Sequence, residues 1–206
     1  TKKGITELAP TLANISAERI QVELVKMLTS PNPGMLKKAY ELGITKVILP
    51  EFDAMMKTTQ ENPHHKYSVG EHTLKALGAI RADKVLRLTM LFHDIGKPLM
   101  KKIDDKGIAH FKMHDSKGAE MTKQILRRLK FDNDTMNKVV RLVQYHDYRM
   151  PAEPKNVRRA MNKIGEDIFP YYLEVRMADT LAQSEYLQKE KIQNIRDVRE
   201  RYEEIL

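Results

Sequence analysis

A histidine and an aspartate stand side by side in the largely apolar stretch Leu88–Ile95, and they strongly constrain how the chain can fold. Burying either side chain without a partner would cost several kcal/mol. Neighbouring residues of a helix diverge by about 100° around its axis, so His93 and Asp94 do not face the same way. Both can still reach a metal ion that lies between their directions, or Asp94 can bridge two ions. In either case, other helices must supply the remaining ligands.

The spacing of apolar residues is helical along nearly the whole chain, which predicts an all-α protein. Ser16 is expected to cap a first helix, and the segment 30–34, rich in Pro and Gly, should end it. Further helices are expected at 35–42, 69–80, 83–95, 114–130, 133–147, 156–164, 167–184 and 186–205.

The intervening segments divide the chain. Residues 57–67 predict a polar loop, and a short β-hairpin is expected near 99–112, with a turn at Asp104–Gly107. The pattern predicts two parts, a small N-terminal helical segment over 1–57 and a larger helical domain over 58–206.

Composition limits the chemistry that is open to the chain. Cysteine is absent from the 206 residues, which excludes disulfides and zinc fingers and suits a cytoplasmic protein. A metal site must use His, Asp and Glu, which favours Mn, Fe, Ni, Mg or Zn bound through nitrogen and oxygen. The net charge of +8 favours anionic partners such as nucleic acid or phosphate esters. No apolar run is long enough for a membrane span, so no membrane partner is expected.

Four further residues stand at positions on other predicted helices where a metal could be shared. These are His72, His114, His146 and Asp179. Each of them alone could also be a buried polar side chain that is hydrogen-bonded within the core, and Asp179 could form an ion pair with Arg176. Together with His93 and Asp94 they form a set that one shared metal site would satisfy.

The ordered set resembles the HD superfamily of metal-dependent phosphohydrolases, which carries His, then His-Asp, then Asp on a helical bundle. The resemblance covers roughly residues 60–185, and His93–Lys97 matches the HDIGK form of the motif. The resemblance implies one metal held by His72, His93, Asp94 and Asp179, and a second metal held by His114, His146 and a bridging Asp94.

The same resemblance implies roles for residues around the metals. Asp94 and Lys97 are expected to be catalytic, and Lys97 is also expected to contact a substrate phosphate, although it could equally be an ordinary lysine at a helix end. His65 is expected to contact substrate. His110, by contrast, alternates with apolar residues in 108–111, and this pattern predicts a structural role.

The N-terminal part is similar to a different family. The segments Asn14–Leu24 and Val47–Glu51 resemble the region that follows the catalytic head of CCA-adding tRNA nucleotidyltransferases, a region that contacts RNA or nucleotide. The chain has no Gly-Ser dipeptide, and its one Asp-x-Asp, Asp132–Asp134, stands where a helix cap explains it. We therefore expect no nucleotide addition from this chain, which is either a fragment or a stand-alone relative.

Taken together, these features predict a metal-dependent phosphohydrolase that acts on phosphomonoesters or phosphodiesters, such as nucleotides, cyclic phosphates or tRNA ends. One alternative is a cyclic nucleotide or dinucleotide phosphodiesterase. Another is a non-catalytic tRNA-binding portion of a CCA-adding enzyme. Basic groups at 127–130 and 155–163 fit RNA contact or an ordinary solvated surface. The number of metal ions, their identity and the oligomeric state stay open.

Overall fold

The computed structural model describes residues 1–206, and its architecture confirms the predicted all-α class. The first part of the chain contains α1 (Lys2–Leu8), the 3₁₀ helix η1 (Ala9–Asn14), α2 (Ala17–Thr29), α3 (Met35–Glu41), α4 (Ile44–Ile48) and α5 (Pro50–Lys57). The remainder contains α6 (Val69–Gly78), α7 (Lys84–Phe92), α8 (Lys97–Met100), β1 (Lys102–Ile103), β2 (Ala109–His110), α9 (His114–Arg128), α10 (Asn133–Tyr145), α11 (Pro154–Ile164), α12 (Phe169–Ala182) and α13 (Gln188–Ile205).

Side-chain caps explain where several of these helices begin. Ser16 accepts a hydrogen bond from the backbone N–H of Arg19, which starts α2 as predicted. Ser68 and Glu71 form a reciprocal capping box at α6. Asp132 accepts from the N–H of Thr135 at the start of α10, so the Asp-x-Asp sequence serves as a cap.

The predicted hairpin is present but very short. Lys102 pairs with His110 and Ile103 with Ala109 in an antiparallel register. Asp104 closes the turn by accepting hydrogen bonds from the N–H groups of Lys106 and Ile108. The N–H of Ala109 also donates to the carbonyl of Glu61, which ties the hairpin to the 58–68 loop.

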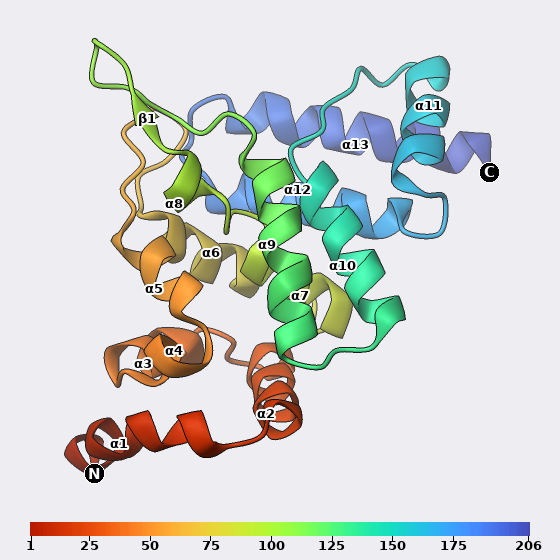
Figure 1. The fold of residues 1–206 in the computed structure, drawn as a ribbon. Coiled ribbons are helices and arrows are strands. Elements are labelled where there is room, and N and C mark those ends of the chain that lie inside the picture. The colour runs from red at the N-terminus through yellow and green to blue at the C-terminus, as the bar shows by residue number, and fades with distance from the viewer.

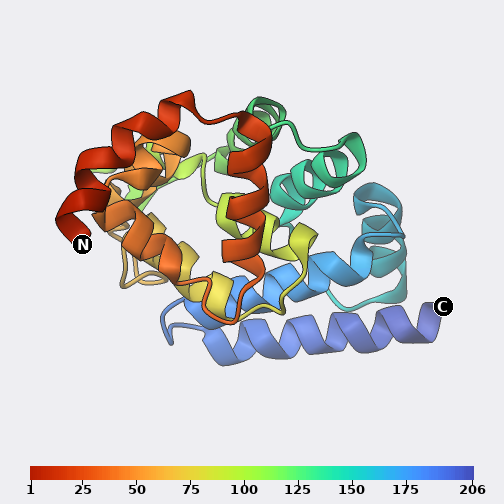
Figure 2. The ribbon, with the colours of Figure 1, turned by 90° about the horizontal axis from the view of Figure 1, so that it is seen from below.

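Helix α7 occupies the centre of the molecule. It packs against α2, α6, α10 and α12, and every residue from Leu86 to Phe92 is buried. Figure 1 shows α9 and α10 in front of α7, with α12 and α13 above it. Figure 2, seen from below, shows α13 lying along α12 at one edge and α1 on the opposite side, with α2 running between them. The turn that follows α7 therefore lies among several helices.

Two apolar clusters form the core. The larger one contains Leu24, Leu28 and Phe52 from the first 57 residues together with Leu88 and Val143 from the rest. The smaller one joins α11, α12 and α13 through residues such as Val157, Phe169 and Val198. The boundary at 57/58 stays a prediction, and the larger cluster has members on both sides of it.

Some local features differ from those predicted. No helix is predicted before Ser16, whereas α1 and η1 occupy 2–14. No residue of α1 is buried, so α1 carries no apolar stripe that a periodicity could reveal. Helix α7 also ends at Phe92 rather than at 95, and a new short helix begins at Lys97. None of the helices is both long enough and apolar enough to cross a membrane.

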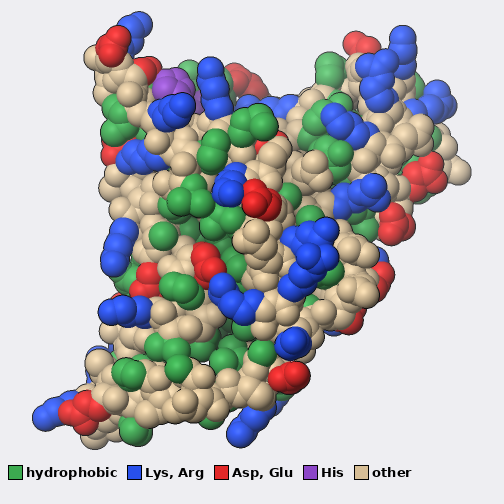
Figure 3. Space-filling model, viewed as in Figure 1, with side chains coloured by type: hydrophobic (Ala, Val, Ile, Leu, Met, Phe, Trp, Pro, Cys, Tyr) green, Lys and Arg blue, Asp and Glu red, His purple; other side chains and the backbone are tan.

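Basic side chains on α11 are free of carboxylate partners. Lys155, Arg158, Arg159 and Lys163 are all exposed and make no ion pair. Figure 3 shows Lys and Arg side chains over the upper right of the molecule, where Figure 1 places α11. This helix face is a positively charged surface.

Candidate metal centre

The six predicted metal ligands converge on one region from five parts of the fold. His72 lies on α6, His93 and Asp94 follow α7, His114 begins α9, His146 follows α10, and Asp179 lies on α12. All except His114 are at most 5% exposed. The apolar faces of these helices pack in the core, and the polar side chains beside those faces meet at one end of α7.

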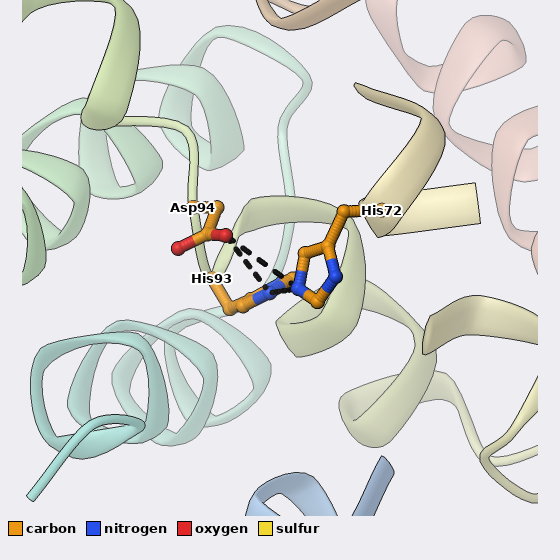
Figure 4. Close-up of side chains that lie close together, drawn as sticks. All are labelled: His72, His93 and Asp94. Carbon is orange, nitrogen blue, oxygen red and sulfur yellow. Dashed lines mark hydrogen bonds and ion pairs between the residues drawn. The ribbon is translucent and has the colours of Figure 1, made fainter. Parts of the chain in front are cut away.

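One half of the centre contains His72, His93 and Asp179. The Nε2 atoms of the two histidines lie 3.1 Å apart, and His72 Nε2 lies 2.9 Å from Oδ1 of Asp179. Oδ2 of Asp94 lies 3.4 Å from His93 Nε2 and 3.6 Å from His72 Nε2. Figure 4 shows both imidazole rings and the Asp94 carboxylate directed toward one another.

The other half contains His114 and His146. Their Nε2 atoms lie 3.2 Å apart, and they lie 3.4 Å and 3.5 Å from Oδ1 of Asp94. Each carboxylate oxygen of Asp94 thus faces a different pair of histidines. This arrangement suits a carboxylate that bridges two cations.

The other nitrogen of each ring is held by a backbone carbonyl. The Nδ1 atoms of His72, His93, His114 and His146 contact the carbonyls of Ala182, Met90, Phe111 and Val143 at 3.3, 2.7, 2.8 and 2.6 Å. A carbonyl can only accept, so each Nδ1 donates, and in the neutral form of each ring the Nε2 lone pair faces the centre.

This tautomer pattern tests whether the residues fit a metal. When both rings are neutral, two Nε2 lone pairs about 3 Å apart cannot hydrogen-bond to each other. Oδ2 of Asp94 makes an ion pair with Lys97 at 2.8 Å but no hydrogen bond of good geometry. A cation in each half would satisfy both sets of donors, because imidazole and carboxylate are ordinary ligands of divalent metals. The donor set therefore fits one or two divalent ions. Their identity is not determined by these ligands.

The pKa values of the buried groups also favour a bound cation. Burial would raise the pKa of Asp94, but Lys97 and His93 hold it well below its usual range. Burial would likewise raise the pKa of Asp179, but hydrogen bonds to His72 and His93 hold it well below its usual range. Burial would lower the pKa of His93, whereas the two carboxylates raise it to about 10. Both carboxylates thus stay charged, and without a metal the raised pKa of His93 places a proton on its Nε2, at the position that a metal ion would otherwise take.

Lys97 lies inside the centre rather than at a solvated helix end. Its Nζ lies 2.8 Å from Oδ2 of Asp94 and donates to Oε1 of Gln60 at 2.8 Å. It also lies 5.3 Å above the ring of Phe111. The residue is 5% exposed, so its role as an ordinary solvated lysine is excluded.

A pocket of about 980 Å³ opens above the centre. Asp94, His114, His146 and Asp179 belong to its walls, and so does His65. The His65 ring packs edge-on against His72 at 4.8 Å, and its Nδ1 has no partner. Burial lowers the pKa of His65 to about 2, so the ring is neutral. His65 thus lies where a substrate contact was predicted, although that role stays a prediction.

Two neighbours of the site behave differently from the ligands. His110 is exposed and pairs with Asp104 at 2.7 Å on the hairpin. Arg176, which the sequence offered as a partner for Asp179, instead lies 3.5 Å from Asp147. Asp179 instead lies 2.9 Å from His72 Nε2 through Oδ1, and Gln183 Nε2 donates to its Oδ2 at 3.1 Å.

Backbone features that place His114 escaped the sequence reasoning. Met113 has a left-handed φ of 66°, and this turn starts α9 at His114. A Cβ on Gly96 would lie 2.2 Å from the carbonyl oxygen of His114 and 2.7 Å from the N of Gly118. Only glycine allows this approach, and the Gly in the HDIGK sequence was the available signal.

Comparisons with known proteins agree with this architecture. Residues 64–193 match the family described as "HD domain", and residues 1–56 match the family described as "Probable RNA and SrmB- binding site of polymerase A". Both resemblances predicted from the sequence are thereby confirmed.

Two curated relatives of the chain are longer than the chain itself. The chain is 34% identical over 172 residues to the CC-adding tRNA nucleotidyltransferase of Thermus thermophilus, a match that covers 80% of this chain and 39% of the relative. It is 36% identical over 169 residues to the A-adding tRNA nucleotidyltransferase of Deinococcus radiodurans, covering 79% of this chain and 38% of the relative. The chain thus spans about two fifths of the length of these relatives.

Proposed function

The chain belongs to the HD domain family, and on that premise we propose that it is a metal-dependent phosphohydrolase. The observation that carries the proposal is the placement of two histidine pairs against the two oxygens of Asp94, beside a wide pocket. A purely structural metal would need a closed coordination sphere, whereas hydrolysis needs access for water and substrate. The pocket supports the second case.

We assign one ion to His72, His93, Asp94 and Asp179, and a second to His114, His146 and the bridging Asp94. Divalent ions bound there would supply positive charge that lowers the pKa of water and polarises a phosphoryl oxygen. Mn, Fe, Ni, Mg and Zn are the candidates. The backbone carbonyls that hold each Nδ1 orient the rings before any ion binds.

The remaining residues supply binding and charge. Lys97 compensates the buried charge of Asp94 and borders the pocket, where its ammonium can attract a phosphate oxygen. His65 is neutral and lines the pocket, which suits a contact with substrate. Asp94 is the catalytic residue in the sense that it would contact both ions.

A nucleotide or RNA end is the substrate class that these surroundings favour. Tyr145 and Tyr148 line the pocket on either side of His146, and Lys163 lies 5.6 Å and 4.6 Å above their rings. Bases stack on such aromatic faces, and a neighbouring cation adds attraction for phosphate. The printed names of the relatives concern tRNA, so we propose a tRNA end as the macromolecular candidate and the cytoplasm as the compartment.

We propose a division of labour at residues 57/58. Residues 1–57 would contact RNA, which the match of residues 1–56 supports, and residues 58–206 would carry the hydrolytic centre. We do not expect nucleotide addition from these residues.

Two other functions remain as alternatives. A cyclic nucleotide or dinucleotide phosphodiesterase would use the same ligands on a cyclic substrate. A non-catalytic tRNA-binding role would leave the centre as a structural metal site, and the similarity to tRNA nucleotidyltransferases supports this reading.

The test joins metal analysis to hydrolysis assays. The purified chain is loaded in turn with each candidate ion and assayed on nucleoside monophosphates, nucleoside 2′,3′-cyclic phosphates, cyclic dinucleotides and 3′-phosphorylated tRNA. We expect hydrolysis of at least one of the noncyclic or 2′,3′-cyclic substrates and its loss in Asp94→Ala.

Asp134→Ala is the matched control, because Asp134 is an exposed aspartate whose only ion pair is with Lys138. Bound metal without hydrolysis of any substrate would favour the non-catalytic alternative. Preference for cyclic dinucleotides would favour the phosphodiesterase alternative.

A further inference from the structure

Lys191 lies at the wall of the pocket, outside the set of metal ligands. It extends from α13, where its Nζ donates to Oε1 of Gln183 at 2.7 Å and contacts Nδ1 of His64 at 3.2 Å. Both acceptors are neutral, and Lys191 makes no ion pair with a carboxylate. A partly buried ammonium therefore has one remaining N–H and no carboxylate in direct contact.

The positive charge around Lys191 is only partly balanced. Arg149 and Arg176 both pair with the same carboxylate, that of Asp147, at 3.0 Å and 3.5 Å. Burial lowers the pKa of Lys191 from its ordinary value, and the charges of Arg149 and Arg176 lower it further, while Asp179 and Asp147 offset only part of this effect. An anion placed here would relieve both the desolvation and the repulsion.

His64 also lines the pocket and can supply a further donor. Because its Nδ1 accepts from the ammonium, a neutral His64 ring carries its hydrogen on Nε2. Burial and the charge of Lys191 lower the pKa of His64, which keeps the ring neutral. The Tyr186 ring also contacts the His64 ring edge-on at 4.9 Å.

The backbone around His64 is held in place. The N–H of Ser184 donates to the carbonyl of His64 at 2.9 Å, and the Ser184 hydroxyl donates to the carbonyl of Pro63 at 2.6 Å. These bonds fix the 62–65 loop on the turn between α12 and α13. The donors of this wall are thus arranged before a ligand arrives.

Gln183 connects this wall to the metal centre. Its carbonyl oxygen accepts from Lys191 while its N–H group donates to Oδ2 of Asp179. Lys191 therefore lies one side chain away from a predicted metal ligand, which is a suitable place for a phosphate held beside the ions.

We propose that Lys191, His64 and Arg149 form a phosphate-binding subsite that holds a phosphate group of the ligand entering the pocket. The proposal rests on the proposed function for the nature of that ligand. The subsite offers hydrogen-bond donors and positive charge, and a phosphate supplies oxygens that only accept.

The test measures binding without hydrolysis. The full chain is stripped of metal with EDTA, and its affinity for adenosine 5′-monophosphate is compared with that for adenosine, which lacks the phosphate. We expect the phosphate to increase affinity. Lys191→Met should lower the ratio of nucleotide affinity to nucleoside affinity by about tenfold, since one charge-assisted hydrogen bond is lost. Lys191→Arg should retain most of the gain. Inorganic phosphate should compete with the nucleotide in the unaltered chain and compete more weakly in Lys191→Met.

Lys189→Met is the matched control, because Lys189 is an exposed lysine on the same helix and does not border the pocket. Thermal melting of every variant checks that it is folded at the assay temperature. Equal affinity for nucleotide and nucleoside in the unaltered chain would overturn the proposal, as would equal losses in Lys191→Met and Lys189→Met. Absence of hydrolysis in the loaded protein would count against the proposed function and leave this binding result intact.

Discussion

The ammonium of Lys97 lies 2.8 Å from Oδ2 of Asp94, and both side chains are almost completely buried. Removing one partner from such a pair leaves the other charge uncompensated, which is more costly than the pair itself is favourable. The relationship therefore gives Lys97 two separable effects, one on stability and one on activity.

Lys97→Met should destabilise the metal-free protein by about 2 kcal/mol or more, because Asp94 loses its nearest cation. Bound divalent ions should offset part of this loss, since they also face Asp94. Hydrolysis should fall by about 10²-fold while metal content stays unchanged, because Lys97 is not a predicted ligand. Denaturant unfolding, metal analysis and steady-state kinetics measure the three effects. Lys101→Met, whose partner Glu61 is exposed, serves as the control, and equal behaviour of the two variants would refute the assignment.

Metal content should report the two halves of the centre separately. If two ions bind, His72→Ala and His114→Ala should each lose one ion per chain, whereas Asp94→Ala should lose both, because only Asp94 faces both histidine pairs. Removing the ions from the unaltered chain should lower its melting temperature, since ions bind only the folded arrangement. Elemental analysis and thermal melting check these outcomes. His110→Ala should retain full metal content, and its loss there would argue that the metal binds elsewhere.

The close approach at Gly96 predicts a strong effect of a single methyl group. Gly96→Ala should destabilise the protein by about 2 kcal/mol or more, because the new Cβ meets backbone atoms of α9. It should also weaken metal binding by displacing His114. Gly78→Ala is the matched control, since nothing lies within 4 Å of its Cβ position, and it should be neutral or stabilising by about 0.5–1 kcal/mol. Chemical denaturation distinguishes the two, and similar effects would contradict the packing argument.

His65 should make the metal-free protein sensitive to acid. Burial lowers its folded-state pKa to about 2, below the ordinary value of 6.5, so the folded chain binds this proton less readily than the unfolded chain. The stability associated with neutral His65 is complete above pH 6.5 and is lost as the pH falls below it, by up to about 1.4 kcal/mol per pH unit. The measurement compares the unfolding free energy of the unaltered chain with that of His65→Gln between pH 7 and about pH 5. The unfolding free energy should fall more steeply with decreasing pH in the unaltered chain. Parallel curves would show that His65 is not responsible.

The basic face of α11 should contribute to RNA affinity. Replacing Arg158 and Arg159 together by Ala should weaken tRNA binding by about tenfold and lower the salt dependence by about one to two counterions, because both guanidinium groups lack carboxylate partners. The paired variant Lys117→Ala with Lys138→Ala is the control, since these two lysines are already bonded to Glu120 and Asp134. Filter binding over a salt series measures both quantities. If the two double variants show equal slopes of log affinity against log salt concentration, α11 does not contact the RNA.

Much of this architecture could be predicted from local patterns. The helical periodicity, the caps at Ser16 and Asp132 and the hairpin turn at Asp104 depend on residues close together in the chain. The missed helix α1 buries no side chain, so its sequence lacks the stripe on which such predictions depend. The predicted end of α7 was wrong. The turn that contains Asp94 is buried by neighbouring helices, so it carries apolar residues, and these residues look in the sequence like a continuation of the helix.

The sequence by itself determined which residue types are available for a metal site and which helices carry them. Only the tertiary structure decided that Oδ1 and Oδ2 of Asp94 face different histidine pairs, and that Asp179 pairs with His72, 107 residues away, rather than with Arg176. It also placed Lys191 beside Gln183 and His64. These relationships depend on the packing of helices that are distant in sequence, and side-chain periodicity records only which face of a helix is buried, not which side chain lies opposite.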